Sequence, residues 1–248
     1  MVMGRSWTRA LAWLVAPTLL LGCASKPDRE VDPRDPLEPF NRATFRFNMD
    51  FDKAFVQPIA RGYQKVTPEP VDRGITNFFD NLADVTSAVN NVLQFKMSRA
   101  GSDVGRVFIN STVGVLGFVD VATNVGLPSY KEDFGQTLGY WGLEPGAYLV
   151  TPFLGPSSMR DAMGKGGDIV TDPLISLRKH QVQWGLLGVR VIDRRADLLT
   201  ATEIVEEASI DPYSFVRDAY LQRRQSLVYD GNPPTDTSQP DFWDEVEF

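Results

Sequence analysis

The sequence is poor in the residues on which most enzyme classes depend. Its 248 residues include one cysteine, Cys23, and one histidine, His180. A single cysteine excludes an intramolecular disulfide framework, and one cysteine with one histidine cannot complete a zinc site. Nucleophilic catalysis with an imidazole base would depend entirely on His180. We therefore expect no catalytic residues, no bound metal and no cofactor.

Three further signatures are missing. Gly164-Lys165-Gly166-Gly167 resembles a phosphate loop only superficially, because the pattern of a glycine, four residues and Gly-Lys-Ser/Thr is absent. No Gly-x-Ser-x-Gly nucleophile elbow occurs, which argues against an α/β-hydrolase lipase. The chain also has fewer positive than negative residues, with 25 Lys and Arg and 32 Asp and Glu, which gives a net charge of −7. We expect no nucleic-acid partner.

The chain has no hydrophobic run long enough to span a bilayer. The uncharged stretch from Ala10 to Leu21 falls short of the ~20 apolar residues that spanning requires, and it contains Pro17. Arg5 and Arg9 precede it, as in the charged region of a signal peptide. We therefore predict a signal peptide over residues 1–22.

The hydrophobic region ends in Leu20-Leu21-Gly22-Cys23, which resembles a bacterial lipobox. This pattern predicts cleavage between Gly22 and Cys23 and attachment of lipid to Cys23. Acyl chains on one cysteine add ~0.8 kcal/mol of membrane affinity for each buried CH₂ group. The next residue is Ala24 and not aspartate, which by resemblance to sorted lipoproteins indicates the outer membrane. Residues 23–34 are then a lipidated tether.

The remaining chain is mostly helical in pattern. Asp35, Pro36 and Glu38 predict a helix start, with Asp35 as the N-cap. Residues spaced three or four apart then predict one aromatic stripe along this helix, made of Phe40, Thr44, Phe47, Phe51 and Phe55. The stripe is either a face packed in the core or a surface that contacts lipid. Pro58 is expected to bend or end this helix.

Further helices are predicted downstream. After a break at residues 67–70, one helix is expected to carry Ile75 and Leu82, and the next covers residues 85–95. Ser158, Asp172-Pro173 and Asp211-Pro212 predict three more helix starts. Between them, residues 134–161 are expected to be irregular and rich in glycine, with positive φ or close approach at Gly135, Gly139 and Gly155. The fold class is mainly α, with a single helical domain over residues 35–230 and an acidic, flexible tail over 231–248.

Several blocks of sequence resemble the MlaA (VacJ) family of outer-membrane lipoproteins. They match in order from about residue 35 to residue 229, and they include Asp35-Pro-Leu-Glu-Pro-Phe-Asn-Arg42, Glu132-Asp-Phe-Gly-Gln-Thr-Leu-Gly139 and Leu154-Gly-Pro-Ser-Ser158. One departure is Phe95, where family members often carry glycine after the Leu-Gln pair. The turn after that helix is therefore expected to differ.

The resemblance implies a ring-like arrangement of amphipathic helices, lipid-anchored in the periplasmic leaflet of the outer membrane. It implies removal of misplaced phospholipid from the outer leaflet, through a polar channel, to a soluble periplasmic lipid-carrier protein. Trimeric porins are the implied membrane partners. Candidate residues for the lipid path or gate are Phe40, Phe47, Asn48, Met49, Gly135, Gly139 and Gly155.

Two other functions stay open at this point. One is a non-catalytic scaffold lipoprotein that binds envelope partners without handling lipid. The other is an envelope hydrolase that works through carboxylates, although adjacent pairs such as Glu132-Asp133 and Glu206-Glu207 do not face each other on a helix. Release of lipid products would identify the hydrolase, and co-purified phospholipid would separate a transporter from a scaffold.

Overall fold

The structure is a computed structural model that describes residues 32–234. The predicted signal peptide, the lipidation site at Cys23 and most of the predicted tail lie outside these residues. The chain divides into two units, Met1–Pro33 and Arg34–Phe248. The second unit contains all of the elements described below.

This unit is mainly α, as the sequence predicts. In chain order its elements are α2 (Glu38–Phe51), the π-helix η2 (Asp52–Val56), α3 (Gln57–Val66), α4 (Glu69–Leu93), α5 (Met97–Thr112), α6 (Val121–Asn124), α7 (Phe134–Tyr140), β1 (Tyr148–Thr151), β2 (Gly155–Ser158), α8 (Met159–Thr171), α9 (His180–Asp197), α10 (Leu199–Ala208) and α11 (Pro212–Val228).

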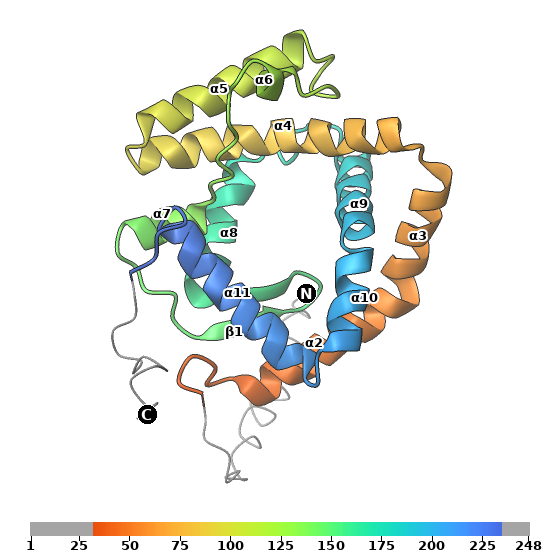
Figure 1. The fold of residues 1–248 in the computed structure, drawn as a ribbon, viewed down its shortest axis with the longest axis vertical. Coiled ribbons are helices and arrows are strands. Elements are labelled where there is room, and N and C mark those ends of the chain that lie inside the picture. Colours follow the sequence, from red (N-terminus) through yellow and green to blue (C-terminus); the bar gives the residue numbers. More distant parts are fainter. Residues whose placement is uncertain (1–31, 235–248) are drawn as a thin grey trace, which may run out of the picture. The chain divides into compact units, whose positions relative to one another are not determined.

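The helices of this unit follow one another around a frame (Figure 1). The long helix α4 forms one side, α3 and α9 lie side by side along the next, and α2 and α10 meet at the corner opposite α4. Helices α7, α8 and α11 complete the circuit, and α5 packs against α4 on the outside. This arrangement agrees with the ring that the family resemblance implies.

The first helix differs from its prediction at its start and agrees with it at Pro58, where a bend or an end was expected. Asp35 is not a side-chain cap: helix α2 begins at Glu38, and the buried Asp35 carboxylate instead accepts a hydrogen bond from Asn41 Nδ2 at 2.8 Å. Pro58 does not end the helix. The π-helical turns of η2 come directly before it, and the chain continues as α3 in a new direction (Figure 1). A π-helical segment accommodates the missing proline N–H, so the bend replaces a break.

Residues 69–93 form one helix and not the two that were predicted. Helix α4 runs without interruption over 25 residues and ends at Leu93. Its C-terminus is a Schellman turn, in which Phe95 N–H bonds the Val92 carbonyl at 3.0 Å and Lys96 N–H bonds that of Asn91 at 2.8 Å. Phe95 takes φ of +60° there. The phenylalanine thus adopts the backbone conformation that glycine adopts at such positions.

The segment over residues 134–161 is more regular than expected. It contains α7 and an antiparallel hairpin of β1 and β2, in which Tyr148 pairs with Ser158. Ser158 caps α8 as predicted, accepting the Asp161 N–H at 3.1 Å. Asp172-Pro173 begins a turn and no helix, because the Asp172 carboxylate accepts the Leu174 N–H locally at 2.9 Å. The next helix, α9, begins only at His180.

Polar side chains make up much of the buried interior. The buried apolar clusters are small: one contains Ala60, Ala196 and Leu199, and the other contains Tyr148, Val150 and Tyr213. Between α4 and α5 the buried residues are instead mostly polar or charged: Asn81, Asp84, Ser87, Asn90, Asn91, Asp103, Arg106 and Asn110. Large hydrophobic side chains are common on the surface of the same helices.

Candidate functional site

The interior of the α4–α5 pair is held together by hydrogen bonds and an ion pair. Arg106 Nε donates to Asp84 Oδ2 at 2.9 Å, and both side chains are buried. Asp103 Oδ2 accepts hydrogen bonds from Ser87 Oγ at 2.7 Å and from Asn91 Nδ2 at 2.8 Å. Burial raises the pKa of the Asp84 and Asp103 carboxyls, and the nearby Arg106 guanidinium offsets only part of this rise. Most of these polar groups are thus paired with one another in place of water, while Asn81 Oδ1 and Asn91 Oδ1 are buried without a hydrogen-bond partner.

Helix α2 presents three different faces, and the first of them holds the hairpin. The Asn41 amide pairs with the edge of β1: its Nδ2 donates to the Tyr148 carbonyl at 3.0 Å, and its Oδ1 accepts the Val150 N–H at 2.8 Å. Two helical turns later, Asn48 donates to the Thr151 carbonyl at 3.0 Å and accepts the Phe153 N–H at 2.9 Å. These amides satisfy backbone groups that an edge strand would leave unpaired.

The second face of α2 contributes Phe47 and Phe51 to an aromatic patch, which also includes Phe55 of η2 and Phe153 of the hairpin turn. The rings touch one another: Phe153 lies with its centroid 5.4 Å from that of Phe47 and 5.0 Å from that of Phe51, both edge to face. Phe47 is 47% exposed and Phe153 is 65% exposed. Phe153 also takes a positive φ of +63° at the turn of the hairpin. Contiguous apolar surface of this kind is typical of contact with a membrane or another protein.

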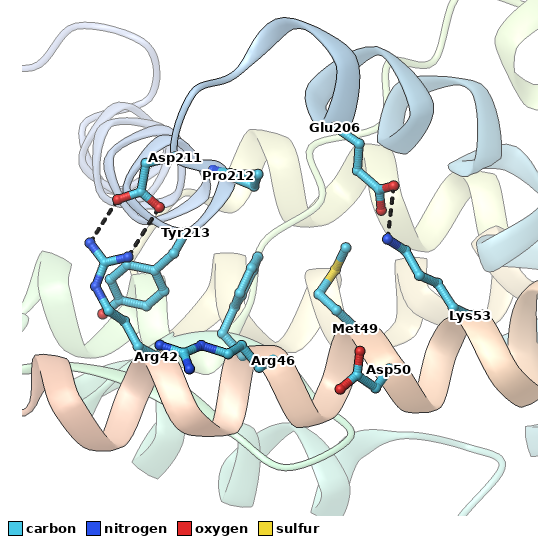
Figure 2. Close-up of a pocket in the computed structure, with 10 residues that line it drawn as sticks. Arg42, Arg46, Met49, Asp50, Lys53, Glu206, Asp211, Pro212 and Tyr213 are labelled. Atoms are coloured by element: carbon cyan, nitrogen blue, oxygen red, sulfur yellow. Dashed lines mark hydrogen bonds and ion pairs between the residues drawn. The ribbon is translucent and has the colours of Figure 1, made fainter.

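The third face of α2 lines a cavity of about 440 Å³ opposite the loop between α10 and α11 (Figure 2). A cavity of this size falls within the ~300–1,000 Å³ range of small-molecule sites. Its walls combine charged groups with apolar side chains: Arg42, Phe45, Arg46, Met49, Asp50, Lys53, Glu206, Asp211, Pro212 and Tyr213.

Two ion pairs stand at either end of the cavity. The two terminal nitrogens of Arg42 donate to the two Asp211 carboxylate oxygens at 3.0 and 2.7 Å, and Lys53 Nζ lies 3.0 Å from Glu206 Oε2 (Figure 2). The hydrogen bonds from Arg42 hold the pKa of Asp211 well below its usual range. The Arg42 guanidinium also lies 4.3 Å from the centre of the Tyr213 ring. These contacts fix α2 to the start of α11.

The predicted path and gate residues do not lie together. Phe40 is exposed, and Asn48 binds the hairpin while Met49 lines the cavity. Gly155 takes φ of +74°, as predicted. A Cβ on Gly135 would lie 2.6 Å from Asp161 Oδ1, and one on Gly139 would lie 2.9 Å from Val228, so both glycines allow the predicted close approach inside α7. Neither of these two glycines lines the cavity of Figure 2.

Sequence reasoning missed the buried polar network and the cavity lining. On α4 the apolar side chains of Val89 and Val92 are exposed, and the buried face is mostly polar. The available signal was the polar stripe that repeats every three or four residues through Asn77, Asn81, Asp84, Ser87 and Asn91. When amide and carboxylate side chains repeat along one face of a helix and apolar side chains along the other, the polar face is expected to form hydrogen bonds with a neighbouring helix.

Two features are absent from the part of the chain that the structure describes. Within residues 32–234, no group of histidine, cysteine, aspartate or glutamate is placed to hold a metal ion. No helix in the same stretch is both long and apolar enough to cross a membrane.

Comparison with known proteins gives consistent similarities. The family model described as MlaA lipoprotein matches residues 33–227. The intermembrane phospholipid transport system lipoprotein MlaA of Escherichia coli is 33% identical, with 95% of this chain and 97% of that protein covered. The Haemophilus influenzae protein of the same name is 32% identical over 89% and 90%. An uncharacterized protein of Rickettsia felis is 35% identical over 78% of each chain.

A solved structure is similar as well. It was reported as the structural basis for maintenance of bacterial outer membrane lipid asymmetry, and it aligns with a TM-score of 0.69 at 34% sequence identity. The alignment covers 78% of this chain and 98% of the other. The similarity therefore extends over the whole of that known structure.

Proposed function

This chain belongs to the MlaA lipoprotein family, and from that premise we propose that it transports phospholipid between membranes and thereby maintains outer-membrane lipid asymmetry. It removes misplaced phospholipid from the outer leaflet and passes it to a soluble periplasmic carrier. No covalent step is needed, since the lipid moves intact.

The observation that carries the proposal is the distribution of polar and apolar side chains. Buried polar groups and exposed phenylalanines reverse the arrangement of an ordinary soluble domain. A protein seated among acyl chains gains free energy from apolar surface on its outside, at ~25 cal/mol per Å². Phospholipid headgroups need the opposite environment, because moving charge through hydrocarbon is costly. The mixed lining of the cavity supplies such an environment.

The remaining parts of the proposal rest on the sequence and the family. Cys23 carries the lipid anchor, residues 24–34 form the tether, and the helical domain lies in the periplasmic leaflet. Trimeric porins hold the domain in the outer membrane. Met49, on the cavity wall, and Asn48, beside the hairpin turn, form part of the gate.

The test measures phospholipid in the outer leaflet of cells that lack the gene. Surface-exposed phospholipid should rise in the deletion strain and return to its normal level when the wild-type gene is restored. Cys23→Ser should fail to restore it, because the unlipidated precursor is not delivered to the outer membrane. Cys23→Ser protein that is sorted normally and fully active would contradict the role of the anchor.

Other results separate the competing functions. An outer leaflet that is unchanged by deletion, with no phospholipid co-purified with the protein, would contradict transport and favour a scaffold. Release of fatty acid or headgroup from phospholipid by the purified protein would favour the hydrolase.

A further inference from the structure

The cavity of Figure 2 contains two charged side chains that the neighbouring ion pairs do not use. Arg46 and Asp50 both line it, both are exposed, and neither makes a hydrogen bond or ion pair with any residue between 32 and 234. They stand on α2 between the Arg42–Asp211 pair at one end and the Lys53–Glu206 pair at the other (Figure 2). The cavity therefore offers one free cation and one free anion.

The spacing of these two charges is set by the helix. Residues four apart lie on the same face, with Cβ atoms ~5–6 Å from each other. A ligand that reaches both must carry a negative and a positive group separated by a short linker. Phosphoethanolamine has this form, because two methylene groups join its phosphate to a primary ammonium.

We propose that Arg46 and Asp50 form a headgroup site for phospholipids that carry a primary ammonium. The Arg46 guanidinium binds the phosphate, and the Asp50 carboxylate accepts hydrogen bonds from the ammonium. This inference rests on the transport function proposed above and adds a headgroup preference to it.

The surroundings of the two charges fit such a ligand. Arg42 is held by Asp211 and Lys53 by Glu206, so Arg46 is the cation left to meet a phosphate. The side chains of Met49 and Phe45 line the same cavity and offer apolar contact to the glycerol and the first methylene groups. One cavity thus offers charged partners to the headgroup of a phospholipid and apolar side chains to its acyl esters.

The site also predicts a ranking among lipids. An anionic phospholipid without an amine gains the contact with Arg46 but meets repulsion from Asp50. A choline headgroup brings positive charge to Asp50 but has no N–H to donate. Binding should therefore be tightest for phosphatidylethanolamine, and weaker for phosphatidylglycerol and phosphatidylcholine.

Binding of short-chain lipids to the full-length lipoprotein in detergent tests the proposal. Arg46→Gln should weaken binding of phosphatidylethanolamine and phosphatidylglycerol alike, by about tenfold, the low end for a charge-assisted hydrogen bond. Asp50→Asn should weaken phosphatidylethanolamine by a similar factor and leave phosphatidylglycerol unchanged or tighter. The ratio of the two affinities is the readout.

Matched controls come from an exposed ion pair on α4. Arg73→Gln and Glu69→Gln make the same changes of net charge away from the cavity, and they should leave both affinities unchanged. Inorganic phosphate serves as a competitor. It should displace phosphatidylethanolamine poorly, because it has no ammonium for Asp50.

Three results would overturn the headgroup site. They are an affinity ratio that Asp50→Asn leaves unchanged, a loss in Arg46→Gln no larger than in Arg73→Gln, and displacement by inorganic phosphate as strong as by the lipid headgroup. In each case wild-type protein that still binds phospholipid would leave transport standing. Wild-type protein that binds no phospholipid, with an unchanged outer leaflet in the deletion strain, would reject the transport function instead.

Discussion

Helices α4 and α5 hide polar side chains from water, whereas α2 and the hairpin turn expose phenylalanines to it. In the first region Asp84, Asp103 and Arg106 are each at most 5% exposed. In the second, Phe47, Phe55 and Phe153 are each about half exposed or more. The difference teaches that the buried polar side chains and the exposed apolar side chains have different roles. Paired polar groups hold the helices together, and the apolar groups remain available to a partner or a membrane.

The largest expected effect comes from breaking the buried ion pair. Arg106→Met removes the partner of Asp84 and leaves a buried carboxylate, so the free energy of unfolding should fall by about 3–5 kcal/mol. Denaturant unfolding measures the loss. Arg73→Met, which breaks the exposed pair with Glu69, should cost less than ~1 kcal/mol. Equal losses in the two variants would show that the buried network has no special role in stability.

Of the two asparagines on α2 that bind the hairpin, the more buried one should contribute more to stability. Asn41→Ala leaves the Tyr148 carbonyl and the Val150 N–H without their side-chain partner and removes one of the hydrogen bonds to the Asp35 carboxylate, so a loss of about 2–3 kcal/mol is expected. Asn48→Ala frees groups near the exposed hairpin turn, which water can reach, and should cost about 1 kcal/mol. Thermal unfolding of both variants checks the order, and the reverse order would contradict it.

Substitution in the aromatic patch should change membrane binding more than folding. Phe47 is half exposed, so Phe47→Asp should lower the free energy of unfolding by only about 1 kcal/mol, through lost ring contacts. Flotation with phospholipid vesicles should show binding at least about tenfold weaker, since the apolar contact is replaced by charge. Phe47→Leu is the control and should keep vesicle binding. Unchanged flotation of Phe47→Asp would mean that the patch faces a protein.

A pH dependence of stability should isolate one half-buried carboxyl, that of Asp168 on α8. Burial raises the pKa of Asp168 to about 6, although its carboxylate accepts the Phe134 N–H at 2.8 Å. Between about pH 4 and 6 the folded chain therefore holds a proton that the unfolded chain has lost, and this group makes stability fall as pH rises.

Asp168→Asn should remove that fall. The variant should match wild type at pH 4 and be more stable above pH 6, because the amide oxygen still accepts the Phe134 N–H. Melting temperatures measured across this range for both proteins check the difference. A constant difference at every pH would assign the effect to packing and not to titration.

The smallest expected effect is a gain. Phe95 holds a left-handed backbone at the end of α4, and its side chain is 76% exposed. Phe95→Gly should raise the free energy of unfolding by about 0.5–1 kcal/mol, because glycine adopts this conformation without strain. Phe95→Leu, which keeps the strain, should give no gain. A loss of stability in Phe95→Gly would show that the ring makes a stabilising contact.

Much of the fold and part of the site could be predicted from local sequence. The Ser158 cap, the start of α11 at Pro212 and the close approach at Gly135 follow from residue types that have few other conformational uses. Asp35 shows the limit of such reasoning. It has the sequence context of an N-cap, but the Asn41 amide and the Tyr213 hydroxyl bind its carboxylate instead. Those partners come from the first turn of α2 and from α11, far away in the sequence.

The sequence by itself determined the mainly helical class, the family and the predicted lipid anchor, because these depend on neighbouring residues and on ordered motifs. Only the tertiary structure decided which face of each helix is buried. Helical phase marks a stripe as polar or apolar but not which stripe points inward, and burial follows from the partner helix. Ion pairs such as Arg42–Asp211 join residues far apart in the chain. The cavity charges left over from that pairing, Arg46 and Asp50, could be recognised only once every other partner was in place.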